Sequence, residues 1–147
     1  MNGKRSIVTM ALFGVIFYLG LLAGIHMEAA DAAPAESARI YELRTYTTNE
    51  GKLDDLHARF SNHTNGLFVK HGITLIGYWT PADGDRADNT LVYLIAHEDR
   101  DSAKASWRAF GADEDWKKAY ADSKKDGALV NHIESQYLIP TDYSPLR

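Results

Sequence analysis

The sequence predicts an α+β domain of the ferredoxin-like type, with a four-stranded antiparallel sheet and its helices on one face. Three observations lead to this fold class. Stretches of strand and helix periodicity alternate in the order β-α-β-β-α-(α)-β, which is the split βαβ arrangement. A polar turn separates the second and third strands, as in a hairpin. The 147 residues are enough for one such domain after an N-terminal leader.

Composition excludes several classes of function. The net charge is −4 and the pI is about 5.8, so nothing favours nucleic acid or anionic lipid, which both select basic surfaces. The chain has no cysteine, which excludes disulfides, thiolate nucleophiles, iron–sulfur clusters and cysteine-based zinc sites. No stretch has the spacing of a metal site, so we expect no metal, and the sequence names no cofactor.

The first 32 residues have the pattern of a secretory signal peptide. Lys4 and Arg5 precede an apolar run over residues 7–25, and a small-residue segment follows. Ala30-Asp31-Ala32 fits a cleavage site with cutting after Ala32, whereas the proline of Ala33-Pro34-Ala35 makes that site weaker.

An uncleaved N-terminal anchor is the alternative, because the apolar run of roughly 19 residues is close to the length that spans a bilayer. Both alternatives predict export, periplasmic or secreted, with membrane contact only through this segment. Residues 33–38 are then a linker, residues 39–140 the folded domain and residues 141–147 a C-terminal tail.

The first strand of the domain is predicted over residues 39–47, where Tyr, Thr and Ile are frequent. Because side chains alternate along a strand, Glu42 and Arg44 share one face with Ile40 and Tyr46. Both faces carry apolar or aromatic residues, and one also carries this charged pair. We therefore expect helices on one side of the strand and a partly polar cavity or interface on the other.

A helix is predicted next, capped by Thr48 or Asn49 and ended by Gly72. His71 lies in its last turn, where a cationic group suits the helix dipole. The apolar face of this helix is expected to consist of Leu53, Leu56, Phe60 and Leu67. The opposite, polar face is expected to consist of Asp54, Asp55, Arg59, Asn62 and Lys70.

A hairpin follows, with strands over residues 73–80 and 90–97 and a polar turn between them. The second of these strands is apolar on both faces, which indicates cover on both sides. A helix capped by Asp99 or Asp101 comes next, and then a shorter one capped by Asp113. The last strand is predicted over residues 129–139.

Only one face of such a sheet is covered by its own helices. The other face would still carry aromatic and aliphatic residues, which is an association liability for a monomer. We therefore predict a homodimer in which two sheets pack face to face.

Three stretches resemble the NIPSNAP family. They are the strand Ile40–Tyr46 followed by Gly51-Lys52-Leu53, the segment Leu67–Gly72 followed by Leu75–Trp79, and Asp115–Tyr120 ahead of the last strand. The resemblance covers about residues 40–139. It implies the dimeric α+β barrel fold, whose superfamily also holds monooxygenases, haem-degrading enzymes and muconolactone-isomerase-like proteins. It implies no agreed reaction or catalytic residue set, because fold likeness alone does not transfer function.

Polar and aromatic residues supply the candidates for a ligand pocket. Arg44 beside Glu42 is suited to bind a carboxylate or an enolate-like oxygen, and the alternative is a structural ion pair. The histidines are candidates for a general base, a haem ligand or a metal ligand, with plain packing as the alternative. His132 and Glu134 share a strand face and are expected to meet Glu42 or Arg44 if the first and last strands are neighbours. The full set of pocket candidates is Glu42, Arg44, His57, Tyr78, Trp79, Tyr93, His132 and Glu134.

Two classes of function remain. The first is a binding module, in which an exported dimer holds a small hydrophobic or aromatic molecule or contacts a protein partner. The second is a small enzyme that uses the barrel cavity as a cofactor-free monooxygenase or isomerase, or with haem. The sequence contains candidate groups for an enzyme but no catalytic constellation, so the binding module is the first hypothesis.

Overall fold

The structure, a computed structural model, describes residues 39–146. The strands are β1 (Ile40–Thr48), β2 (Thr74–Trp79), β3 (Thr90–His97) and β4 (Val130–Leu138). The helices are α2 (Leu53–Arg59), the π-helical turn η1 (Phe60–Thr64), α3 (Asn65–Lys70), α4 (Arg100–Ala112) and α5 (Glu114–Asp122). The predicted order of elements is thus confirmed, and no predicted strand end differs from the observed one by more than one residue.

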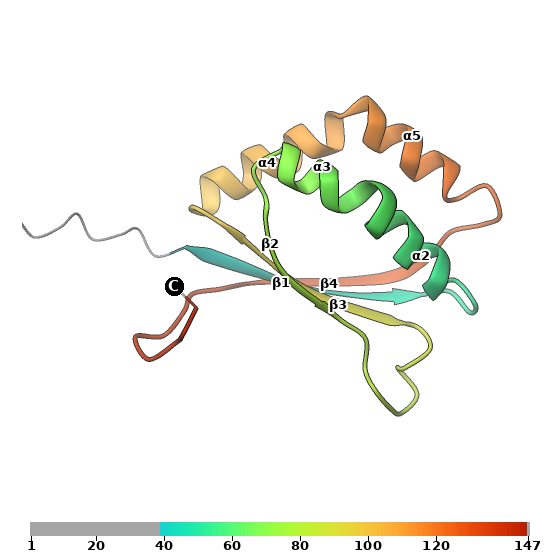
Figure 1. Cartoon of the computed structure of the whole chain (residues 1–147), viewed down its shortest axis with the longest axis horizontal. Coiled ribbons are helices and arrows are strands. Elements are labelled where there is room, and N and C mark those ends of the chain that lie inside the picture. Colours follow the sequence, from blue (N-terminus) through green and yellow to red (C-terminus); the bar gives the residue numbers. More distant parts are fainter. Residues whose placement is uncertain (1–38, 147) are drawn as a thin grey trace, which may run out of the picture. The chain divides into compact units, whose positions relative to one another are not determined.

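The four strands form one open antiparallel sheet in the order β2-β3-β1-β4. β1 is therefore a central strand, and β2 and β4 are the two edges. Figure 1 shows the helices stacked on one face of this sheet, with the opposite face uncovered. This is the predicted ferredoxin-like α+β arrangement.

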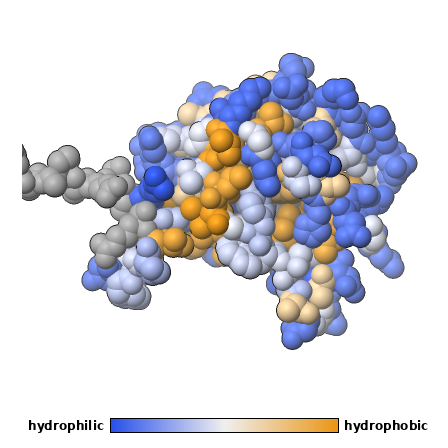
Figure 2. Space-filling model, in the orientation of Figure 1, coloured by the Kyte–Doolittle hydropathy of each residue, from blue (hydrophilic) through white to orange (hydrophobic). Residues whose placement is uncertain are grey.

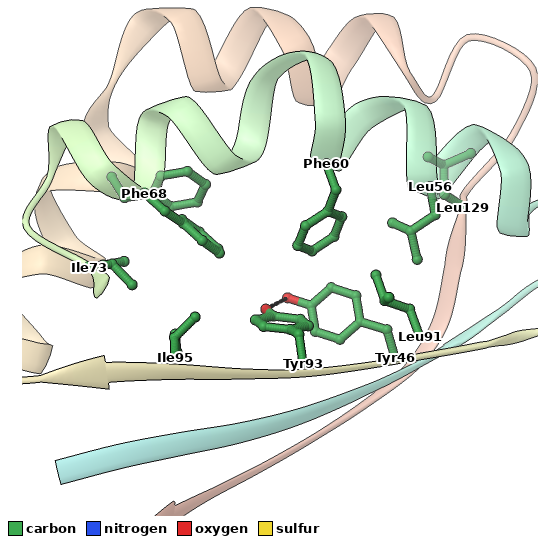
Figure 3. Close-up of a cluster of buried hydrophobic side chains, with 10 residues drawn as sticks. Tyr46, Leu56, Phe60, Phe68, Ile73, Leu91, Tyr93, Ile95 and Leu129 are labelled. Carbon is green, nitrogen blue, oxygen red and sulfur yellow. Dashed lines mark hydrogen bonds between the residues drawn. The ribbon is translucent and has the colours of Figure 1, made fainter. Parts of the chain in front are cut away.

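The hydrophobic core lies between the helices and the sheet. Figure 3 shows Phe60 and Phe68 pointing down from the helical layer toward Tyr93 and Tyr46 on the strands. Aromatic rings meet edge to face in this layer, for example Phe60 against Tyr93 with 5.2 Å between centroids. The buried cluster consists of Tyr46, Leu56, Phe60, Phe68, Ile73, Leu91, Tyr93, Ile95, Phe110 and Leu129.

The first helical stretch differs from its prediction in two ways. Its N-cap is Lys52, which makes no side-chain cap hydrogen bond. The predicted cap residue Asn49 has another role, because its side-chain amide donates to the Ala128 carbonyl at 2.7 Å. The stretch is also not one regular helix, since η1 interrupts it. The Thr64 hydroxyl donates to the Arg59 carbonyl at 3.2 Å, five residues back, inside this wider turn.

The π-helical turn decides which side chains reach the core. Leu56, Phe60, Thr64 and Phe68 recur every four residues and are all buried. In a regular helix such a stripe would drift by about 40° at each step, and the wider turn absorbs this drift. Phe68 rather than Leu67 is therefore the core residue of α3, and the assignment of Arg59 to the polar face is wrong, because Arg59 is buried.

The second helical layer agrees with its prediction. The Asp99 carboxylate accepts a hydrogen bond from the Ser102 amide at 2.7 Å and caps α4. The Asp113 carboxylate accepts from the Asp115 amide at 2.8 Å and caps α5. In Figure 2 the upper rim of the view, where Figure 1 places α5, is mostly hydrophilic, whereas hydrophobic atoms gather in the middle of the view.

The charged pair of β1 lies on the helix-covered face. Glu42 is opposite Ile95 and Tyr137, and it shares its face with Tyr46 of the core. The polar side of β1 is therefore the side under the helices, rather than a face separate from them as expected. The signal peptide or anchor predicted for residues 1–32, and the linker over residues 33–38, lie outside the described residues. Within residues 39–146, no helix combines the length and the apolar character needed to cross a membrane.

Candidate functional site

The carboxylate of Glu42 is the centre of a polar cluster in which Glu42 and His97 are buried, Arg44 and Trp107 are half-buried and Ser135 is exposed. The Glu42 side chain is fully buried and receives hydrogen bonds from four other residues. Arg44 Nη1 and Ser135 Oγ both lie 2.6 Å from Oε1. Trp107 Nε1 donates to Oε2 at 2.7 Å, and His97 Nε2 lies 3.3 Å from the same oxygen. Strands β1, β3 and β4 and helix α4 each supply one of these partners.

These partners keep Glu42 ionised. Burial raises the pKa of the Glu42 carboxyl, but hydrogen bonds from His97, Ser135 and Trp107 and the charge of Arg44 outweigh it and lower the pKa to about 2. A general base near neutral pH needs a pKa near 7 and a free lone pair directed at its substrate. Glu42 has neither, so its geometry is that of a structural anion.

Arg44 links this carboxylate to two tyrosines. Its Nη2 donates to the Tyr46 hydroxyl at 3.3 Å, and the Tyr93 hydroxyl donates to the same oxygen at 3.0 Å. The guanidinium lies 4.6 Å from the centroid of the Trp107 ring. Burial lowers the pKa of the Arg44 guanidinium. The opposite effect of Tyr93, Tyr46 and Glu42 is larger, so the pKa lies above its usual value. Arg44 is thus a paired, fixed cation.

A cavity of about 410 Å³ lies beside the cluster, between the helices and the β1–β4 part of the sheet. Tyr46 and Trp107 belong to both the cluster and the cavity wall, whereas Glu42, Arg44 and His97 do not line the cavity. Seven of its sixteen lining residues are Phe, Tyr or Trp. The lining residues are Tyr46, Arg59, Phe60, Thr64, Phe68, Trp107, Phe110, Trp116, Tyr120, Lys124, Ala128, Leu129, Val130, Asn131, His132 and Ile133.

Arg59 is the buried cation of this wall. It is the last residue of α2 and only 5% exposed. Its guanidinium lies 5.5 Å from the Trp116 ring centroid and 5.4 Å from that of Tyr120. Nη1 donates to the Ser123 hydroxyl at 3.3 Å, and Nε is buried without a hydrogen-bond partner among residues 39–146. Burial lowers the pKa of Arg59, and the tyrosines around it only partly offset this.

The structure brings together some of the predicted site residues. Glu42 and Arg44 form the predicted ion pair, and an imidazole joins them, but it is His97, not His57 or His132. The prediction that His132 or Glu134 meets this pair is wrong. β4 is the neighbour of β1, but its register places Ser135 opposite Arg44 and turns His132 and Glu134 to the other face.

The remaining predicted histidines have different surroundings. His132 borders the cavity at the edge strand, with its imidazole 3.6 Å from Glu134 and both side chains exposed. His57 lies half-buried on α2 and lines none of the cavities described here. His71 Nε2 donates a hydrogen bond to the Asp113 carboxylate at 2.7 Å, which ties the end of α3 to the start of α5.

Tyr78, Trp79 and Tyr93 do not line one pocket. Tyr78 and Tyr93 stack on the helix-covered face with 5.5 Å between centroids, and burial raises the pKa of Tyr78 to about 12. Trp79 lies on the opposite face, folded over Gly77, and is 53% exposed. None of the three lines the 410 Å³ cavity.

Sequence reasoning missed the residues that contribute most to the site. Ser135 and His97 lie 93 and 55 residues from Glu42, so their contact depends on strand register. The charge of Arg59 predicts an exposed side chain. In the part of the chain that the structure describes, no three His, Asp or Glu side chains gather as a metal site would require.

Solved structures of similar fold include NIPSNAP-family proteins from two bacteria. An uncharacterized NIPSNAP-like domain protein from Burkholderia xenovorans is 20% identical with a TM-score of 0.64, and covers 74% of this chain and 90% of its own. A NIPSNAP family protein of unknown function from Agrobacterium tumefaciens is 22% identical with a TM-score of 0.66, and covers 76% of this chain and 96% of its own. At these identities the likeness shows the fold.

The family follows from the sequence match. No curated protein matches this sequence. The model of the NIPSNAP family matches residues 41–145, which is most of the chain and nearly all of the described domain. The resemblance seen in the three sequence stretches is thereby confirmed, and the chain belongs to the NIPSNAP family.

Proposed function

We propose that this protein is an exported, dimeric binding module that holds a small hydrophobic or aromatic molecule between its helices and its sheet. One observation carries the proposal, which is the 410 Å³ cavity with aromatic walls. Small-molecule sites are typically concave, mostly apolar and a few hundred Å³ in volume. A few polar groups among apolar walls are also typical of such sites, and Arg59 and Asn131 provide them here.

An enzyme that works in the same cavity is the less favoured alternative. Such an enzyme needs a titratable group that faces the reacting atoms with a pKa matched to proton transfer. Glu42 has all its hydrogen-bonding positions occupied and a pKa of about 2, and it stands behind Tyr46 and Trp107 rather than in the cavity wall. These features favour binding over catalysis.

The dimer is proposed to form through the uncovered face of the sheet. Register places Leu43, Leu94 and Gly77 in one row across that face, next to the exposed Trp79. No helix of residues 39–146 packs on this face (Figure 1), although Tyr41 and its strand partner Ala96, at one end of it, are buried. Packing against a second copy would bury this apolar row.

Native mass spectrometry of the full chain, produced with its own leader in a bacterial host, tests export, dimerisation and small-molecule binding in one experiment. The measured mass reports whether the chain is cut after Ala32, whether it is a dimer and whether it retains a small molecule. A cut dimer with a retained molecule supports the proposal. An empty protein that binds none of a panel of small apolar compounds contradicts the binding role, and a monomer at micromolar concentration contradicts the dimer.

A further inference from the structure

Arg44 and Arg59 both lie near the core, and they differ in burial and in their partners. Arg44 is half-buried and has an anionic partner in the chain, with its Nη1 2.6 Å from the Glu42 carboxylate. Arg59 is more deeply buried, and no carboxylate of residues 39–146 forms an ion pair with it. Within those residues its one side-chain hydrogen bond goes to a neutral hydroxyl. The Arg59 Nε has no partner among them, and the same is true of the Arg44 Nε.

An unpaired buried charge is costly. Arginine remains protonated in proteins, so Arg59 cannot avoid the cost by losing its proton. Buried charges are normally paired, and the fold shows this with Arg44. The missing partner of Arg59 is therefore an anion that the described chain does not supply.

The cavity wall has the charge that such an anion requires. Its sixteen lining residues include the cations Arg59 and Lys124 but neither aspartate nor glutamate, and the side chain of His132, which also borders the cavity, is turned to the other face of the sheet. This is notable in a chain with a net charge of −4. Lys124 stands near the Arg59 side, with its ammonium 4.5 Å from the Tyr120 ring centroid. An anion inside the cavity would thus meet two cations and no competing carboxylate.

The acidic residues near Arg59 lie on its other side. Asp55, Asp122 and Asp126 line a separate shallow pocket between α2 and α5 that also touches Arg59. Asp122 is engaged by Lys118 and Lys125, and Asp55 is engaged by Lys52. An anion approaching from this outer side would meet repulsion, so the aromatic cavity is the side open to it.

We infer that the cavity takes an organic carboxylate, with its anionic group on the Arg59 guanidinium and its apolar body among the aromatic side chains. A guanidinium matches a carboxylate in geometry and forms charge-assisted hydrogen bonds with it. Trp107, Phe110 and Trp116 offer ring surfaces to the apolar part. This inference rests on the proposed binding function and adds the chemical class of the ligand.

Isothermal titration calorimetry of the full chain with matched probes tests the inference. The probes are 1-naphthoate, its neutral counterpart 1-naphthalenemethanol, and decanoate as an aliphatic carboxylate. We expect naphthoate or decanoate to bind about tenfold to a hundredfold more tightly than the neutral alcohol, as one charge-assisted contact provides. The better of the two carboxylates identifies the body as aromatic or aliphatic.

Variants assign the preference to Arg59. Arg59→Gln is expected to lower carboxylate affinity to that of the alcohol while the alcohol binds as before. Arg59→Lys keeps the charge and is expected to restore part of the preference. Arg108→Gln removes an exposed arginine of α4 away from the cavity and is expected to change neither affinity.

The outcomes separate this inference from the proposed function. If wild type binds the alcohol as tightly as both carboxylates, or if Arg59→Gln keeps the preference, the carboxylate inference is overturned and the binding function stands. If no probe binds wild type, both fail. If Arg59→Gln does not fold, as judged by circular dichroism, the test uses wild type and Arg59→Lys. The carboxylate inference is then overturned if wild type shows no preference for a carboxylate over the alcohol, or if Arg59→Lys leaves that preference unchanged.

Discussion

Ser135 Oγ donates a hydrogen bond of 2.6 Å to Glu42 Oε1 and so joins the edge strand β4 to the central strand β1 through a buried charge. The two residues are 93 positions apart in the sequence. Ser135 is opposite Arg44 in the strand register, and it donates to the Glu42 carboxylate from β4. Trp107 donates to the same carboxylate from helix α4.

Replacing this serine tests how much the cluster stabilises the fold. Ser135→Ala removes one of four donors from a buried carboxylate, and such a bond contributes about 1.5–3 kcal/mol. We expect the free energy of unfolding in urea to fall by roughly that amount. Ser61→Ala, at an exposed hydroxyl that bonds only locally, should change it by less than about 0.5 kcal/mol. Equal effects of the two changes would contradict the role given to Ser135.

The low pKa of Glu42 predicts a loss of stability in acid. The folded pKa of about 2 is below the unfolded value near 4.5, so the folded state binds fewer protons between these values. The stabilisation is complete above about pH 4.5 and is lost as the pH falls toward 2. We expect the melting temperature to decline through this window.

Glu42→Gln separates this contribution from those of the other carboxyls. Asp122 also has a pKa lowered to about 2, by Lys118 and Lys125, so part of the acid dependence remains in the variant. The variant should lose about 3–5 kcal/mol at neutral pH, because Arg44 is left unpaired. Its melting temperature should also fall less steeply with acid than that of wild type. Parallel curves would show that Glu42 is not a linked group.

Most of the fold was predictable from the sequence, because local patterns set it. Runs of strand-forming residues bounded by turns identified the strands, and Asp99 and Asp113 are helix caps in the structure as their positions indicated. The pairing of Glu42 with Arg44 was predictable because two residues on one strand share a face. His97 and Ser135 were not, since their contacts follow from register across strands far apart in sequence.

Arg59 shows the limit most clearly. Its charge predicts an outward side chain, although it follows Leu56 by three positions and so lies near the same helix face, and it is 5% exposed. Charged side chains are mostly exposed in folded proteins, so a prediction from sequence places an arginine on the solvent face of a helix. The π-helical turn that follows it also has no propensity signature, so its effect on the helix face could not be anticipated. The candidate ligand anchor was therefore visible only in three dimensions.

A stability measurement on Arg59 distinguishes a ligand anchor from a structural residue. Arg59→Met removes a buried charge that has no ion pair among the described residues and keeps much of the apolar volume. Replacing buried charges by apolar groups is often neutral or stabilising. We expect the free energy of unfolding of the ligand-free protein to be unchanged or raised by up to about 2 kcal/mol, while carboxylate binding is lost. A loss of several kcal/mol would instead indicate that Arg59 maintains the fold.

The uncovered face of the sheet gives the last prediction. Leu94 lies in the middle of β3 on that face, opposite Leu43 of β1. In a dimer formed through this face, Leu94→Glu would bury one unpaired carboxylate from each copy in the interface, which costs several kcal/mol. We expect the dimer dissociation constant, measured by analytical ultracentrifugation, to rise by about a hundredfold or more, with helix content unchanged. Val69→Glu is the matched control, because Val69 is 61% exposed on α3, on the helical side of the molecule, and should leave the dimer intact. If Leu94→Glu remains as dimeric as Val69→Glu, the two copies do not meet through this face.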